Sequence, residues 1–222
     1  MTNFGRHWKP TRPGMSSTQL ADRAQELRSS LRFQEPSRVA ARSGASYLEL
    51  DPGRGELRIP LWKKVCILSW PELLGWDSKD DVLPDLQQAL LLYYLVTADD
   101  TSLTGTWVSF AELPNGRMYS SAFQGYSGDE IAKTYDLNLD AFEQACNLAG
   151  GKEFMVGNAS FIFQALPRLP LMVTYWLGDA DFPSSSKILF DEAACHYLPI
   201  DACAVLGGML ARKLIAVDGT RS

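Results

Sequence analysis

Apolar residues recur at helical spacing in several segments of the chain. Residues 16–32 carry apolar side chains every three or four positions with polar residues between them, which is typical of an amphipathic helix. Residues 84–96 begin with a proline and are then apolar on nearly all sides, so this helix is expected to lie in the core. Further helices are expected over residues 128–135, 139–148 and 201–214, the last of them capped by Asp201.

Alternating or continuous apolar runs between these helices predict β-strands. Residues 47–50, 56–61 and 65–70 form three such runs, and the sequence Asp-Pro-Gly-Arg-Gly at residues 51–55 favours a tight turn between the first two. Further strands are expected over residues 107–110, 159–166, 169–177 and 187–190. The chain is therefore predicted to be an α+β protein, with antiparallel sheet segments flanked by helices around a single core.

The start of the chain differs from the rest in composition. Residues 1–15 contain two prolines and two glycines and are expected to form an extended tail. Residues 1–42 hold eight Arg or Lys and three Asp or Glu, a net charge of +5, so that the remainder carries −10 of the total of −5. We therefore divide the chain into a basic N-terminal tail and helix, residues 1–42, closed near Pro36, and an α+β domain, residues 43–222.

This distribution of charge bears on the partners. An acidic body repels nucleic acid, and the basic segment has too few cations and stacking aromatic rings for a nucleic-acid arm, so no nucleic-acid binding is expected. The segment is instead expected to lie on the acidic body or on an acidic partner. A protein partner that binds through residues 1–42 is therefore predicted.

The cysteines and the apolar runs exclude other classes of protein. The four cysteines are scattered, without a C-x-x-C pair or a histidine at zinc-finger spacing, which argues against a zinc or iron–sulfur site. The first 14 residues lack the apolar stretch of a signal peptide, and no run of about 18 apolar residues occurs. A cytoplasmic protein without membrane insertion is expected.

His196 is the most suggestive candidate for chemistry. The chain has two histidines, and this one follows Asp191 and Glu192, whose carboxylates are expected to orient its imidazole. Such an imidazole can ligate the metal of a tetrapyrrole, act as a general base, or tie a loop to a helix in the core. A hydrolase or transferase built on His196 has no evident nucleophile except the neighbouring Cys195, which need not point the same way.

Aromatic side chains provide a second feature. The stretch from Trp107 to Phe123 combines rings with hydroxyl groups, a mixture that lines pockets for flat ligands, protein interfaces and ordinary cores. The pair Asp179 and Asp181 has too few carboxylates for a calcium site and is interpreted as a solvated turn. The three serines at residues 184–186 lack the glycine frame of a phosphate-binding loop and are interpreted as a flexible loop.

Several short blocks together resemble a known family. The blocks at residues 104–114, 169–171, 181–183, 189–191 and 196–199 occur in the order found in the bacterial and archaeal family called domain of unknown function 3786. The resemblance covers residues 41–214. It implies a fold but no activity, since none is established for the family. Some members look fused to a four-cysteine iron–sulfur module of corrinoid proteins in anaerobic one-carbon metabolism. Residues 1–42 contain no cysteine, so this module is absent here.

Two functions follow as hypotheses. In the first, the protein is a non-enzymatic accessory protein that binds a corrinoid, haem or related tetrapyrrole cofactor, or its carrier protein, at His196, Asp191, Glu192, Trp107 and Phe123. In the second, it is a structural or interaction subunit of a larger complex with no cofactor of its own. The first is the leading hypothesis and rests on the flanked histidine, the aromatic-rich body and the family resemblance. The second rests on the basic segment, the acidic body and the lack of a catalytic set.

Overall fold

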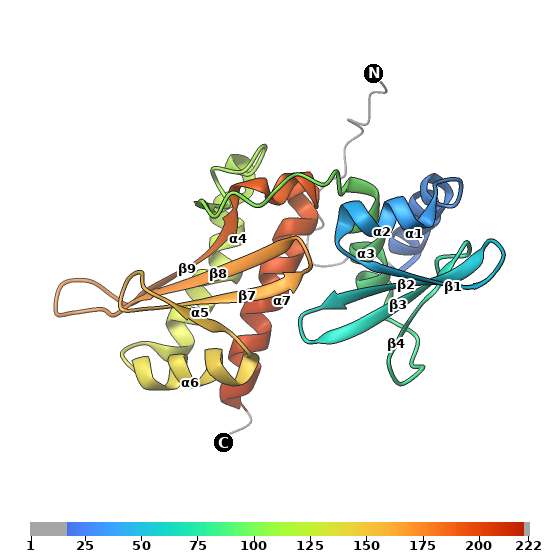
Figure 1. Cartoon of the computed structure of the whole chain (residues 1–222). Helices are drawn as coiled ribbons and strands as arrows, with labels where there is room; N and C mark the ends of the chain where they lie inside the picture. The colour runs from blue at the N-terminus through green and yellow to red at the C-terminus, as the bar shows by residue number, and fades with distance from the viewer. Residues whose placement is uncertain (1–16, 220–222) are drawn as a thin grey trace.

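The computed structural model describes residues 17–219, and within them the side chains of residues 23–217. The expected tail over residues 1–15 lies outside the described residues. Figure 1 shows two neighbouring parts, in which the first three helices cover one antiparallel sheet and the later helices cover a second sheet. The predicted α+β class is thus confirmed.

Two helices precede the first sheet, α1 (Ser17–Leu31) and α2 (Pro36–Ser43). Ala24, Leu27 and Leu31 of α1 are buried, as the apolar stripe in the sequence predicted. Pro36 was expected to close this region, but it opens α2 instead. Proline suits a first helical turn because the N–H that it lacks has no partner there.

The first sheet has the strand order β1-β2-β3-β4, with every neighbouring pair antiparallel. Its strands are β1 (Ser46–Asp51), β2 (Arg54–Leu61), β3 (Lys64–Trp70) and β4 (Gly75–Asp77). The first three form the predicted meander. The short β4, which the sequence pattern did not reveal, adds a fourth strand beside β3.

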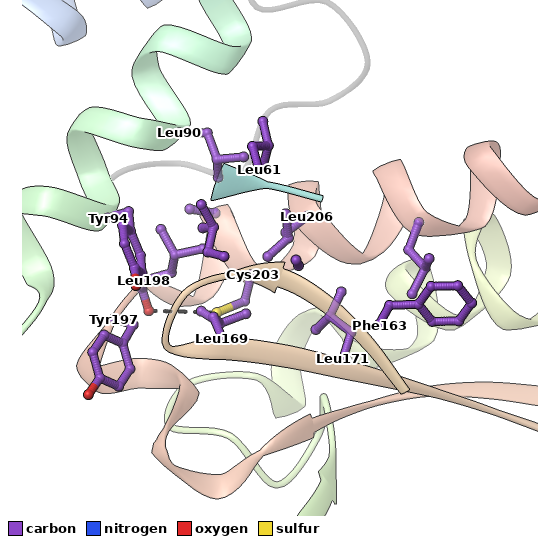
Figure 2. Packing of buried hydrophobic residues seen from close by; sticks show 14 of the residues in the cluster. Leu61, Leu90, Tyr94, Phe163, Leu169, Leu171, Tyr197, Leu198, Cys203 and Leu206 are labelled. Carbon is purple, nitrogen blue, oxygen red and sulfur yellow. Dashed lines mark hydrogen bonds between the residues drawn. The ribbon is translucent and has the colours of Figure 1, made fainter. Parts of the chain in front are cut away.

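Helix α3 (Asp85–Thr97) lies between this sheet and the rest of the chain. All eight residues from position 88 to position 95 are buried, which agrees with the apolar pattern around the whole helix. Figure 2 shows Leu90 and Tyr94 of this helix near Leu61 at the end of β2 and Leu198 of the segment before α7. The helix is therefore packed against both parts of the molecule.

The second sheet has the order β5-β9-β8-β7-β6 and is also antiparallel throughout. Its strands are β5 (Trp107–Ser109), β6 (Lys152–Phe154), β7 (Ala159–Leu166), β8 (Leu169–Trp176) and β9 (Ser185–Asp191). The short edge strand β6 was not expected. Strand β8 is buried along nearly its whole length, so both faces of this sheet are covered in its centre.

The helices of the second half surround this sheet. They are η1 (Arg117–Tyr119), α4 (Ser120–Tyr126), α5 (Gly128–Tyr135), α6 (Leu139–Ala149), η2 (Glu192–His196) and α7 (Ile200–Gly219). Asp201 was expected to cap the last helix, but α7 already begins at Ile200 and Asp201 lies in its first turn. The same helix extends past the predicted end at residue 214.

Arginines of α1 and α2 bind the chain itself. Arg23 Nε donates to the Tyr93 hydroxyl at 2.5 Å, and Arg28 Nη2 donates to Gln88 Oε1 at 2.8 Å. Arg42 Nη2 donates to the carbonyl of Leu95 at 3.0 Å. Three of the basic residues that the sequence offered to an acidic partner are thus held by polar groups of α3.

A buried hydroxyl links three elements. The Tyr94 side chain on α3 is fully buried, and its hydroxyl donates to the carbonyl of Ser43 at the end of α2. It also accepts the N–H of Arg168 in the turn between β7 and β8, at 2.9 Å. Burial raises the pKa of this phenol, so it stays neutral and can donate.

Substitution Tyr94→Phe should lower the free energy of unfolding by about 1–3 kcal/mol, because it leaves a buried carbonyl and a partly buried N–H without their partner. Urea unfolding followed by far-ultraviolet circular dichroism measures this. The control is Tyr119→Phe, whose hydroxyl makes no hydrogen bond within residues 17–219 and which should change stability by less than about 0.5 kcal/mol. Equal effects of the two substitutions would contradict the role of Tyr94.

Candidate functional site

The candidate site lies where two connecting segments meet. Residues 98–106 follow α3, and the backbone N–H of Glu192, at the start of η2, donates to the carbonyl of Thr106 at 2.9 Å. Strand β5 then continues this contact by pairing with β9. His196 stands at the end of η2, four residues before α7, and so faces the segment that leaves α3.

His196 is held by Asp99. Its Nδ1 lies 2.7 Å from Asp99 Oδ2, and the Thr101 hydroxyl lies 3.1 Å from the same nitrogen. The side chains of His196 and Asp99 are each about half exposed, at 50% and 49%. Because a carboxylate accepts at Nδ1, that nitrogen carries the proton. Nε2, which makes no hydrogen bond to the described part of the chain, is then free to accept or to ligate.

The carboxylate of Asp99 is itself kept ionised. Partial burial works to raise its pKa, but hydrogen bonds from His196 and from the hydroxyl and N–H of Thr101 outweigh it and lower the pKa. The group therefore stabilises the fold above the ordinary pKa of an aspartate, and this contribution is lost as the pH falls through its lowered value. At neutral pH Asp99 is an anion that fixes the tautomer of His196.

Asp191 has a different task from the one expected. It is 1% exposed, and its two oxygens accept the N–H and hydroxyl of Thr104, the N–H of Gly105 at 2.8 Å and the N–H of Ala193 at 2.9 Å. It thus fastens the segment after α3 to the start of η2. The exposed Glu192 makes no side-chain hydrogen bond that the structure describes. Asp99, and neither of these two residues, orients His196.

The two predicted aromatic residues lie in different surroundings. Trp107 is half-buried on β5 and pairs in register with Asp191, so it belongs to the strands that carry the site. Phe123 on α4 is 3% exposed and stacks on Phe110 with ring centroids 4.4 Å apart. It lies in an aromatic cluster of the core with Tyr126 and Phe190.

Phe123 also borders a small cavity of about 280 Å³. Its lining includes Ser109, Ser120, Ser121 and Lys187, and thus joins the hydroxyl groups and rings that the sequence placed between positions 107 and 123. His196 is not in this lining. The structure therefore does not bring Phe123 and His196 together around one ligand.

Cys195 does not complete a catalytic pair with His196. A hydrogen bond from the Cys203 thiol lowers the pKa of Cys195; burial opposes this, and the charge of His196 adds to it. Cys203 is fully buried, its pKa is raised, and its sulfur also lies 3.6 Å from the carbonyl of Leu198, the contact drawn dashed in Figure 2. Within the described residues His196 hydrogen-bonds Asp99 and Thr101 only, so no nucleophile and base are joined.

The described part of the chain contains neither a ready-made metal cluster nor a membrane-spanning helix. No group of three or more His, Cys, Asp or Glu side chains there is placed to hold a metal ion. Nor does any helix in residues 17–219 have the length and hydrophobicity to cross a bilayer.

Comparison with known proteins identifies the family. The family described as Domain of unknown function (DUF3786) matches residues 35–213. The chain belongs to this family. Among curated proteins and solved structures, nothing matches. The range shared with the DUF3786 family begins at the residue that caps α2 and ends within α7, so it contains the whole candidate site and excludes α1.

Sequence reasoning missed Asp99 and Thr101 as residues of the site. Asp99 lies just past the helix predicted over residues 84–96, and its carboxylate accepts the N–H of Thr101 only two positions further on. Its partner His196, however, is 97 positions away in the sequence. No local pattern in this DUF3786 protein signals that contact, because it depends on how the end of α3 packs beside η2.

Substitution Asp191→Asn should lower the free energy of unfolding by about 2–4 kcal/mol, since the new NH₂ group faces N–H donors and the charge-assisted acceptor is lost. Hydrogen exchange of the amides at residues 104 and 105 should accelerate at the same time. Urea unfolding and hydrogen-exchange mass spectrometry test both effects. Glu192→Gln is the matched control on the exposed neighbour, and an equally large loss there would contradict the assignment.

Proposed function

We propose that this DUF3786 protein is a non-enzymatic accessory protein that offers His196 as a ligand to the metal of a corrinoid or related tetrapyrrole. The observation that carries the proposal is the His196 Nδ1–Asp99 Oδ2 hydrogen bond of 2.7 Å with Nε2 left free on a half-exposed ring. The resemblance to members fused to modules of corrinoid proteins supplies the choice of cofactor and its setting in anaerobic one-carbon metabolism.

The residues fit one axial ligand. A histidine that binds a metal donates its other ring N–H to a carboxylate or carbonyl, which fixes the tautomer and makes the ligating nitrogen more basic. Asp99 does this for His196. A bound tetrapyrrole would supply a metal that the free Nε2 of His196 would hold.

The exposure of His196 bears on how the cofactor would arrive. The ring stands at the surface, and neither of the two cavities described in this structure contains it in its lining. A macrocycle would therefore meet His196 from outside, and its other face would be covered by a carrier protein. Asp191 fastens the segment of residues 98–106 to η2, and this contact would keep Asp99 and Thr101 in place while the macrocycle docks.

The same pair of side chains is also found where a histidine acts as a general base. Base catalysis of acyl or group transfer needs a nucleophile within hydrogen-bond reach, and Cys195 is not bonded to His196 in the described residues. The contacts therefore favour ligand binding over a hydrolase or transferase.

Visible absorption of added cofactor tests the proposal. A corrinoid that lacks its own lower axial base should show a shifted band on mixing with the protein, because imidazole replaces water at the metal. His196→Ala should abolish the shift, and Asp99→Asn should weaken binding about tenfold, in line with the loss of a partner that orients a ligating histidine.

The control is His7→Ala, which removes the only other histidine of the chain and should leave the shift unchanged. The same titration with haemin distinguishes a corrinoid from a porphyrin. If the wild type changes neither spectrum, or if His196→Ala behaves as the wild type does, the proposal is wrong.

A second candidate is an interaction subunit without a cofactor of its own. It is favoured by exposed apolar side chains at one end of the second sheet, in the two hairpin loops that lie side by side in Figure 1. This hairpin tip consists of Phe154, Met155, Val156, Leu177 and Phe182, and Met155 and Phe182 are 99% and 72% exposed. Hydrogen bonds of Asn158 to Tyr175 and Leu177 join the two loops. Exposed apolar clusters of this kind are typical of protein interfaces.

Light scattering coupled to size exclusion tests this second candidate. If the hairpin tip is an interface, the double substitution Met155→Ser and Phe182→Ser should dissociate a complex that the full chain forms with itself or with a co-purifying partner. Leu137→Ser, on a residue between α5 and α6 that is 64% exposed, is the control and should leave the complex intact. A deletion of residues 1–15 tests the predicted role of the basic segment in the same experiment. A monomer in every form, with no co-purifying partner, would contradict this candidate.

A further inference from the structure

A cavity of about 460 Å³ lies between the first sheet and α7, away from His196. Figure 1 shows the turn between β2 and β3 pointing from the first sheet toward α7. The lining of the cavity comes from this turn, β3, β4, the segment before α3 and α7, and includes Trp62, Lys63, Lys64, Cys66, Asp77 and Lys213. Its volume falls in the range of sites for small molecules, about 300–1,000 Å³.

Three lysines bring positive charge to this cavity. Lys63 and Lys64 lie on or next to the β2–β3 turn, and Lys213 comes from α7, with its ammonium 5.2 Å from the ring centroid of Trp62. Burial lowers the pKa of Lys213, and the charges of the other two lysines lower it further. Within the described residues none of the three forms an ion pair with a carboxylate. Their mutual repulsion is thus not relieved by a direct ion pair in that part of the chain.

The backbone holds the lysines in this arrangement. Trp62 adopts a left-handed conformation with φ 58°, and its N–H donates to the carbonyl of Ala165 on β7 at 2.8 Å. The turn is thereby tied to the second sheet. Lys63 passes against Gly150, where an added Cβ would stand 1.9 Å from the Lys63 Cε atom. A side chain at position 150 would therefore displace this lysine. Glycine is thus favoured at this position both by the close approach of Lys63 and by its own φ of 87°.

The remaining walls are mostly apolar. Leu61, Leu83 and Pro84 line the cavity beside the ring of Trp62. Two carboxylates, Asp77 and Asp81, also line it. One oxygen of Asp77 accepts the N–H groups of Lys79 at 2.8 Å and Asp81 at 3.2 Å, and neither carboxylate forms an ion pair with the three lysines in the described residues. A ligand thus finds cations near one part of the cavity and an aromatic and aliphatic surface near another.

We propose that this cavity binds a small organic phosphate, whose phosphate group is held by Lys63, Lys64 and Lys213 and whose apolar or aromatic body lies against Trp62. A phosphate monoester carries close to two negative charges at neutral pH, and lysine binds phosphate as a point charge. A carboxylate, with a single negative charge, would neutralise only one of the three ammonium groups. The walls on several sides suit a small molecule better than a nucleic acid, and the chain as a whole carries a charge of −5.

Calorimetric titration with simple probes tests the proposal. Phenyl phosphate should bind most tightly, since it carries both groups that the cavity can hold. Inorganic phosphate and benzoate should each bind at least about tenfold more weakly, because each lacks the ring or the second charge. Raising the salt concentration should weaken all three.

Variants locate the site. Lys213→Met keeps the aliphatic stem and should weaken phenyl phosphate at least about tenfold, while its melting temperature stays at or above that of the wild type because repulsion is relieved. Lys133→Met, on an exposed lysine of α5, is the matched control and should bind as the wild type does. His196→Ala should also bind normally, which separates this site from the proposed function.

Four results would overturn the proposal. They are the absence of phenyl phosphate binding to the wild type, an equally strong binding of benzoate, an equal loss in Lys213→Met and Lys133→Met, and a short RNA that competes more tightly than phenyl phosphate and depends on Lys213. The last would assign the lysines to a nucleic acid.

Discussion

Helix α3 is enclosed on all sides, and the hydroxyl of its Tyr94 is shared between the end of α2 and the turn between β7 and β8. A buried polar group of this kind is stabilising only when both of its bonds are made. The helix therefore ties the end of α2 to the β7–β8 turn of the second sheet. Both the segment that leaves α3 toward Asp99 and the turn that carries Lys63 and Lys64 lie next to this junction, so their positions depend on it.

The candidate site is a consequence of this packing. Asp99 follows directly after α3, and Asp191 closes β9 by gathering four donors from two segments. The first of these carboxylates is half exposed and holds an imidazole, whereas the second is buried and holds backbone. The two aspartates thus differ in environment, although both lie near the ends of regular elements: Asp99 stands at the surface beside His196, and Asp191 holds the loop from within.

In the folded chain, arginines of the basic N-terminal segment form hydrogen bonds with α3 and its neighbourhood. Arg23, Arg28 and Arg42 direct their guanidinium groups at a hydroxyl, an amide and carbonyl oxygens of α3 and its neighbourhood. Arginine is suited to this role because its aliphatic chain packs on apolar surface while its guanidinium group keeps several N–H donors available. By contrast, Lys63, Lys64 and Lys213 line one cavity beside Trp62 and form no ion pair within the described residues, and we propose that a phosphate binds there.

The periodicity of the sequence determined most helices, the meander and the central strands of the second sheet, because burial along an element depends on local spacing of apolar residues. The short strands β4 and β6 and the helix α4 have too few residues for a period to show, and only their neighbours stabilise them. The sequence also singled out His196. Its partner Asp99, the anchoring role of Asp191 and the meeting of Lys63 with Lys213 were decided by tertiary structure alone, since each joins groups far apart in the chain whose encounter depends on how α3 and α7 pack between the sheets.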